Sequence, residues 1–141
     1  MREVERALGA KIVQRRSLHG GDISKAFAVE LDDGRHIFVK TSDLGREGMF
    51  EAEAHGLGWI GEGNALRVPE VIAFSDAKGA AFLALEMLTP GPRAADFDER
   101  LGRGLAALHR ASPGTFGLSR SNYIGHVPQT NEARPTWARF Y

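Results

Sequence analysis

Two charged side chains, Lys40 and Glu53, are the residues of this sequence best suited to chemistry. Lys40 ends the strand-like run 36–40. Glu53 lies four residues after Met49 and four before Leu57, so these three side chains share one face of a predicted helix. That face is apolar and should turn toward a sheet, where a carboxylate is costly unless it is paired. Lys40 is a suitable partner, and the pair would hold an ammonium group where phosphates could bind.

The same two residues also allow simpler interpretations. A lysine at the end of a strand is usually solvated, and an ion pair between Lys40 and Glu53 could be purely structural. Glu53 could also reach solvent at the edge of the sheet. Glu51 lies about 200° from Glu53 around the helix axis and is expected to face solvent. The pair therefore indicates a phosphate site only together with its neighbours.

A glycine turn precedes the strand of Lys40. Gly20 and Gly21 would let the backbone approach a phosphate closely and point N–H groups at it, and Ser24 could donate its hydroxyl group. Asp22 makes the turn less attractive to an anion. Taken alone, the segment is interpreted more simply as an ordinary hairpin turn.

A nearly continuous apolar run, 81–88, predicts a buried strand that ends at the Pro- and Gly-containing segment 89–92. Backbone groups of Glu86, Met87 and Leu88 could pair with the edge of an adenine ring in an apolar cleft. The alternative is a strand that simply ends there.

Composition excludes several classes of function. The chain has 141 residues, enough for one domain with a core, and its formal net charge is zero, which does not support a broadly basic surface for nucleic acid. It contains no cysteine, which excludes disulfides and thiolate metal sites and fits a cytoplasmic protein. No apolar run approaches the roughly 20 residues that span a bilayer. The histidines show no metal-binding spacing. We therefore expect no nucleic-acid or membrane partner and no metal ligand in this chain.

Apolar periodicity and turn signals predict the elements that must position these residues. The predicted strands are 11–18, 24–31, 35–41, 70–74 and 81–88. The predicted helices are 2–9, 46–61, 97–111 and 135–141, and 112–135 is predicted to be an irregular loop. Gly102 and Gly104 fall inside a helical pattern and are expected to weaken that helix.

This order of elements predicts an α+β fold with a five-stranded antiparallel sheet and one inserted helix. A glycine turn, a strand lysine and a helix glutamate, in that order, are typical of the small lobe of a protein-kinase-like fold, where they prepare a site for the phosphates of ATP. Many other α+β domains could show the same element order.

The chain resembles the fructosamine (ketosamine) kinase family, within the aminoglycoside-phosphotransferase and protein-kinase-like fold. The resemblance spans nearly the whole chain in family order. The sequence stretches that carry it are Gly-Gly-Asp-Ile-Ser at 20–24, Phe-Val-Lys at 38–40, Met-Phe-Glu-Ala-Glu-Ala at 49–54, Arg-Val-Pro-Glu-Val at 67–71, Phe-Leu-Ala-Leu-Glu at 82–86, Leu-Ala-Ala-Leu-His-Arg at 105–110, Phe-Gly-Leu at 116–118, Asn-Tyr-Ile-Gly at 122–125, Pro-Gln-Thr-Asn at 128–131 and Trp-Ala-Arg-Phe-Tyr at 137–141.

The resemblance implies an ATP- and Mg²⁺-dependent phosphotransferase that acts on a sugar hydroxyl of ketosamines and so repairs glycated amines or proteins. It implies that Lys40 binds phosphate with Glu53 as its partner, that the turn 20–24 covers the phosphates and that the backbone of 86–88 binds adenine. The loop from Asn122 to Asn131 would lead toward the substrate. It also implies a division into a nucleotide-binding lobe (1–88), a hinge (89–92) and an incomplete large lobe (93–141).

The family's catalytic His-Gly-Asp loop and its metal-binding Asp are expected after the region that ends at Tyr141, and no His-Gly-Asp occurs in these 141 residues. We therefore expect the front half of a kinase, with no catalytic residue of its own, magnesium ligands elsewhere and no activity alone. Two alternatives stay open. One is a kinase for an aminoglycoside, choline or homoserine, and the other is a non-catalytic module that binds nucleotide or self-associates through the apolar face formed by Phe97, Leu101, Leu105 and Leu108.

Overall fold

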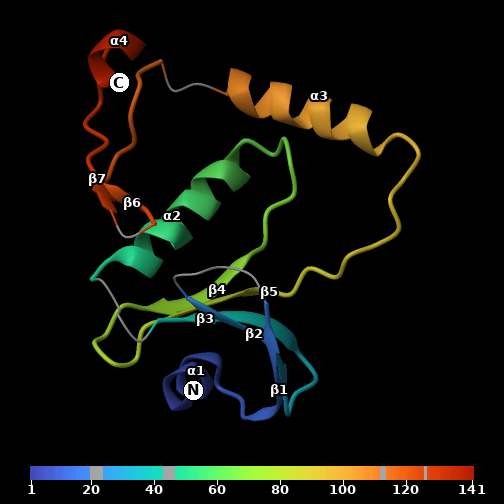
Figure 1. Ribbon diagram of the computed structural model, residues 1–141. Helices are drawn as coiled ribbons and strands as arrows, with labels where there is room; N and C mark the ends of the chain where they lie inside the picture. The colour runs from blue at the N-terminus through green and yellow to red at the C-terminus, as the bar shows by residue number, and fades with distance from the viewer. Residues whose placement is uncertain (20–23, 43–46, 112–113, 126) are drawn as a thin grey trace.

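The computed structural model describes residues 1–19, 24–42, 47–111, 114–125 and 127–141. Its main feature is a five-stranded sheet in the order β1-β2-β3-β5-β4, in which every neighbouring pair is antiparallel (Figure 1). The strands are β1 (Ile12–Leu18), β2 (Lys25–Leu31), β3 (His36–Thr41), β4 (Val71–Ser75) and β5 (Phe82–Glu86), with helix α1 (Arg2–Leu8) before them and helix α2 (Met49–Glu62) between β3 and β4. The predicted α+β fold is confirmed.

A tight hairpin joins β2 to β3 and fixes where Lys40 lies. Gly34 adopts φ 84°, a left-handed conformation that suits glycine, and the register then pairs Ala26 with Lys40. Side chains alternate along β3, so Ile37 and Val39 are buried on one face while Lys40 projects from the other.

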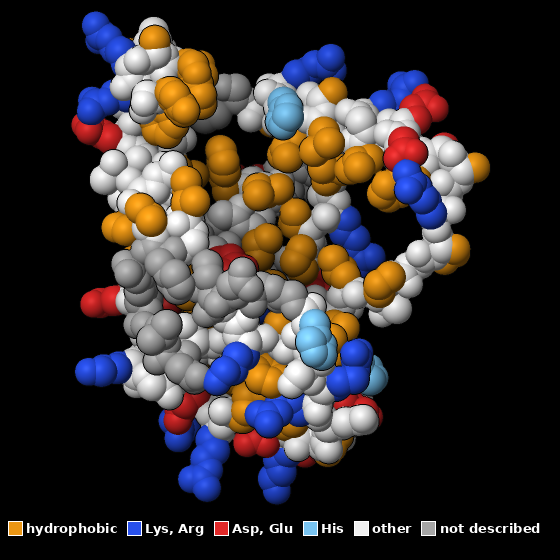
Figure 2. Space-filling view, viewed as in Figure 1, with side chains coloured by type: hydrophobic (Ala, Val, Ile, Leu, Met, Phe, Trp, Pro, Cys, Tyr) orange, Lys and Arg blue, Asp and Glu red, His pale blue; other side chains and the backbone are white. Residues whose placement is uncertain are grey.

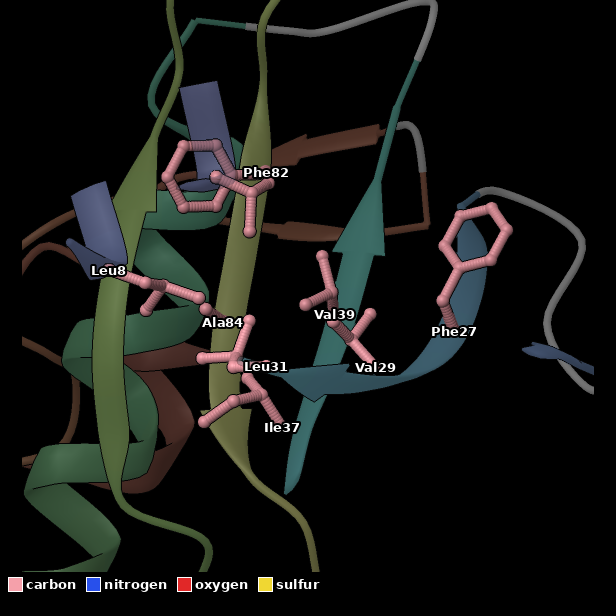
Figure 3. Packing of buried hydrophobic residues seen from close by; sticks show 9 residues of the cluster. Leu8, Phe27, Val29, Leu31, Ile37, Val39, Phe82 and Ala84 are labelled. Atoms are coloured by element: carbon pink, nitrogen blue, oxygen red, sulfur yellow. The ribbon is translucent and has the colours of Figure 1, made fainter. Parts of the chain in front are cut away.

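One face of the sheet packs against α1. Buried side chains from β2, β3 and β5 gather there with Leu8 of α1, as Figure 3 shows. The buried cluster consists of Val4, Leu8, Phe27, Val29, Leu31, Ile37, Val39, Phe82 and Ala84. This cluster fixes β3 from the side opposite to Lys40.

The other face packs against α2, which Figure 1 shows on the opposite side of the sheet from α1. Phe50 and Ala54 of α2 meet Leu83 and Leu85 of β5 in a second buried cluster. β5 is therefore buried on both faces, as its uninterrupted apolar run predicts.

An aspartate far along the chain holds the start of α2. The Asp76 carboxylate, after β4, accepts the backbone N–H groups of Phe50 at 3.0 Å and Glu51 at 2.9 Å. A carboxylate at this end also interacts favourably with the helix dipole. The predicted start of this helix at residue 46 lies outside the described residues, and the described helix begins at Met49.

After β5 the chain runs without regular structure to helix α3 (Phe97–Arg110), which lies apart from the sheet in Figure 1. Phe97, Leu101 and Leu105 of α3 are about two-fifths exposed, at 43%, 38% and 40%. Figure 2 shows hydrophobic side chains gathered between α2 and α3 around a hollow in the surface. The predicted apolar stripe of α3 is therefore only partly covered.

The prediction of an irregular loop over 112–135 is wrong in part. Residues Asn122–Ile124 (β6) and Val127–Gln129 (β7) form a two-stranded antiparallel sheet, and helix α4 (Trp137–Phe140) follows. These strands have three residues each, and one includes Pro128, which cannot donate a ladder hydrogen bond. They are therefore too short to show the alternation of apolar and polar residues that predicts a strand. Contacts with α2 and with the buried Asn131 hold this small sheet instead.

Candidate functional site

The Lys40 ammonium group lies against the Glu53 carboxylate. Its Nζ atom is 2.8 Å from Oε1 and 2.7 Å from Oε2 of Glu53, so both carboxylate oxygens accept a hydrogen bond. The two side chains come from β3 and α2 and remain 27% and 36% exposed. The predicted ion pair is confirmed, and because it is only partly buried, its ammonium group can still be reached by a ligand.

Glu51 contrasts with Glu53 on the same helix. Its side chain is 46% exposed and pairs with Arg120 at 2.8 Å. It therefore points away from the sheet, in the direction predicted, but it meets a partner there.

A cleft of about 680 Å³ opens beside the ion pair. Ala26, Phe38 and Leu85 of the sheet form its apolar floor, and α2 forms one wall. The segment around β6, residues 120–125 and 127–131 (the β6 segment), also borders the cleft, through Asn122 and Tyr123. A cleft with apolar walls and a few charged groups is typical of small-ligand sites.

A second cavity of about 470 Å³ lies toward the end of β5, where Met87, Thr89 and Pro90 line it. Its lining includes His36, which shares the face of Phe38 and Lys40 on β3. His36 and Lys40 are four residues apart on β3, a separation of about 13 Å along the strand. His36 of the second cavity and Phe38 and Lys40 of the first therefore lie along one face of β3.

The backbone at Glu86 is less free than the sequence suggests. Its N–H group donates to the carbonyl oxygen of Glu70 at 2.8 Å, and its carboxylate pairs with Arg67. This N–H group is therefore not available to an adenine ring. Leu88 is 38% exposed, and Met87 lines the second cavity.

The predicted glycine turn cannot be placed, because Gly20, Gly21 and Asp22 lie outside the described residues. Ser24, which follows directly, lines the cleft beside Lys40. The role of the turn over phosphates stays a prediction.

Sequence reasoning missed two residues that connect the β6 segment to the start of α2, Arg120 and Tyr123, and a third, Asn131, that supports Arg120. The Tyr123 hydroxyl group donates to the carbonyl oxygen of Glu47 at 3.0 Å, just before α2. Asn131 is 7% exposed and donates to the backbone of Arg120. The resemblance over 122–125 and 128–131 covers Tyr123 and Asn131 but not Arg120, and it assigned no contact to either of them.

Mg²⁺ prefers several oxygen ligands. Within the described ranges, no group of three or more His, Cys, Asp or Glu side chains could hold a metal ion. The described residues alone therefore supply no such group of protein ligands. None of the described helices is long and apolar enough to cross a membrane.

Comparisons with known proteins agree with this geometry. The family model of fructosamine kinase matches residues 1–141. A Synechocystis protein named "Probable ketoamine kinase" is 36% identical over 93% of this chain and 44% of its own length. The chloroplastic protein-ribulosamine 3-kinase of Oryza sativa subsp. indica is 34% identical over 93% of this chain and 39% of its own length.

Solved structures show the same fold. A crystal structure from Thermobifida fusca that is named for fructosamine-3-kinase superimposes with a TM-score of 0.84 at 33% identity, over 99% of this chain and 48% of that one. One from Haemophilus somnus, similarly named, gives a TM-score of 0.86 at 25% identity, over 97% and 48%. The chain spans about half the length of these relatives. It belongs to the fructosamine kinase family.

Proposed function

We propose that the cleft beside Lys40 binds ATP. The observation that carries this proposal is the ammonium group of Lys40, which Glu53 holds on both oxygens at the mouth of an apolar cleft. An oriented ammonium group neutralises phosphate charge. The adenine ring would lie toward Met87, where the second cavity meets the backbone that follows β5. Ser24 would lie near the phosphates.

As the reaction, we propose ATP-dependent phosphorylation of a sugar hydroxyl on a ketosamine. Relatives named ketoamine kinase and protein-ribulosamine 3-kinase support this choice of substrate class. Bound Mg²⁺ would supply charge neutralisation at the phosphates. The division into a nucleotide-binding lobe (1–88), a hinge (89–92) and the start of a large lobe (93–141) is part of the proposal, and the separation of α3 from the sheet supports it. We also propose a cytoplasmic location, which the absence of cysteine supports.

Calorimetric titration of the 141-residue chain with ATP tests the proposal. Lys40→Ala should weaken binding at least about tenfold, because a charge-assisted hydrogen bond contributes about 1.5–3 kcal/mol. Lys78→Ala is the matched control, since Lys78 is an exposed lysine in the turn after β4. Equal affinity in the two variants would show that Lys40 does not contact phosphate.

Catalysis is a separate question from binding. Because the family's His-Gly-Asp motif is absent from the 141 residues, we expect this chain alone to form no ADP in the presence of a ketosamine. A coupled ADP assay measures this, and ketosamine-dependent ADP release would contradict the expectation. Aminoglycoside, choline and homoserine serve as comparison acceptors.

Self-association through Phe97, Leu101, Leu105 and Leu108 is a second candidate function. The exposure of the first three side chains favours it, because apolar side chains exposed together on one helix favour association. Light scattering over a concentration series tests it. A monomer at every concentration would exclude it.

A further inference from the structure

The first turn of α2 is held from two directions. Asp76 binds its backbone N–H groups from the turn after β4. From the other direction, Arg120 pairs with Glu51 at 2.8 Å, and the Tyr123 hydroxyl group donates to the Glu47 carbonyl oxygen at 3.0 Å. The second set of contacts spans 69 and 76 positions in the chain. They therefore connect α2 to a segment that follows α3.

Asn131 stabilises the segment that provides these contacts. Its side-chain amide donates to the Arg120 carbonyl oxygen at 3.1 Å and to the Asn122 side-chain oxygen at 2.9 Å. Asn131 is 7% exposed, and a buried amide with both hydrogen bonds made favours one conformation of its surroundings. The backbone of Arg120 and the start of β6 are thereby tied together.

Glu53 lies in the same turn of α2 as Glu51 and presents its carboxylate to Lys40. A shift of this turn would move the Glu53 carboxylate relative to the ammonium group of Lys40. We propose that Arg120, Tyr123 and Asn131 form a clamp that keeps the first turn of α2 in the position where Glu53 orients Lys40. Arg120 and Tyr123 are then positioning residues for the nucleotide site, and this use of the clamp rests on the proposed function.

The contacts set the size of the expected effect. Arg120 and Glu51 are 37% and 46% exposed, so solvent screens their ion pair. Loss of this ion pair and of one neutral hydrogen bond should together raise the equilibrium constant for local opening of α2 roughly three- to tenfold. Asp76 still holds the helix in the variants, so α2 should loosen while the sheet keeps its structure.

Amide hydrogen exchange measured by NMR on the full chain tests the clamp without nucleotide. Arg120→Ala combined with Tyr123→Phe should speed exchange in the first turns of α2 about three- to tenfold and leave β2, β3 and β5 unchanged. Arg134→Ala is the matched control, because it removes an ion pair with Glu132 in the same part of the chain without touching α2. Arg120→Lys should retain part of the protection, since it keeps the charge.

A charge reversal adds a test that general destabilisation would not pass. Glu51→Arg and Arg120→Glu should each speed amide exchange in α2. In the double variant the ion pair is restored with its charges reversed, so exchange in α2 should be slower than the sum of the two separate effects predicts. Exchange in α2 that matches the Arg134→Ala control, or the absence of rescue, overturns the clamp.

ATP titration of the same variants connects the clamp to the site. Arg120→Ala with Tyr123→Phe should raise the Kd about three- to tenfold, while Arg134→Ala should leave it unchanged. Faster α2 exchange with unchanged ATP affinity would overturn the positioning role. If the unmodified chain binds no ATP, the proposed function fails, and the exchange measurements still decide whether the clamp exists.

Discussion

Gly104 of α3 lies directly against Leu66, in the connection between α2 and β4. A Cβ atom at position 104 would overlap the Leu66 side chain and lie 3.0 Å from the carbonyl oxygen of Ala65. Glycine inside a helix costs roughly 1 kcal/mol relative to alanine. Here the missing side chain lets α3 approach the connection closely, so the residue that weakens the helix also permits its packing.

Substitution of the two glycines of α3 by alanine should change the stability of the fold in opposite directions. Gly102→Ala has open space around it and should raise the free energy of unfolding by up to about 1 kcal/mol. Gly104→Ala makes the same gain but must displace Leu66 and the backbone, at a cost of about 1–3 kcal/mol. The free energy of unfolding measured in urea should be lower for Gly104→Ala than for Gly102→Ala. Equal stabilities would show that α3 is not packed as described.

Much of the sheet could be predicted because its signals are local. The Asp-Asp-Gly-Arg turn, the alternation along β3 and the apolar run of β5 each lie within a few residues. Glu53 could be predicted for a related reason, since a carboxylate among apolar helix positions needs a cationic partner. Lys40 was the suitable strand lysine, and the structure places the two together.

The features that the sequence did not predict depend on contacts between residues far apart in the chain. Asp76 binds the start of α2 from 26 positions away, and nothing around Asp76 indicates a helix cap. Two contacts outside the ladder hold the small sheet: Tyr123 donates to the carbonyl oxygen of Glu47, and Asn131, beyond β7, donates to Asn122 of β6. Local propensity carries no information about such pairings, and so the loop prediction failed there.

Removal of the Asp76 carboxylate should loosen α2. Asp76→Ala leaves the N–H groups of Phe50 and Glu51 without their acceptor and should lower the free energy of unfolding by about 1–2 kcal/mol. Asp76→Asn keeps one oxygen acceptor and should lose less. Urea denaturation measures both. A larger loss in Asp76→Asn than in Asp76→Ala would contradict the capping role.

Glu53→Gln should weaken ATP binding through Lys40. Without the carboxylate, the lysine regains rotamer freedom that binding must remove, a cost of about 1 kcal/mol or roughly fivefold in Kd. Because the effect acts through Lys40, Lys40→Ala combined with Glu53→Gln should bind no more weakly than Lys40→Ala alone. Glu62→Gln, an exposed change at the end of the same helix, is the control. Additive losses in the combined variant would argue for a direct contact between Glu53 and nucleotide.

Acid should weaken the hairpin between β2 and β3 through Asp33. The Asp33 carboxylate accepts hydrogen bonds from the side chain and backbone of Arg35, which lowers the pKa of Asp33 below its ordinary value of 3.8. Arg35 also donates to the carbonyl oxygen of Leu8 at 2.8 Å, which ties the hairpin to the end of α1. A depressed pKa in the folded chain means that the stabilisation is present above about pH 4 and is lost as the pH falls through the folded pKa. Urea unfolding at pH 5 and pH 3 should therefore show a smaller difference in Asp33→Asn than in the unmodified chain. An unchanged difference in Asp33→Asn would rule out this carboxylate as a source of the acid sensitivity.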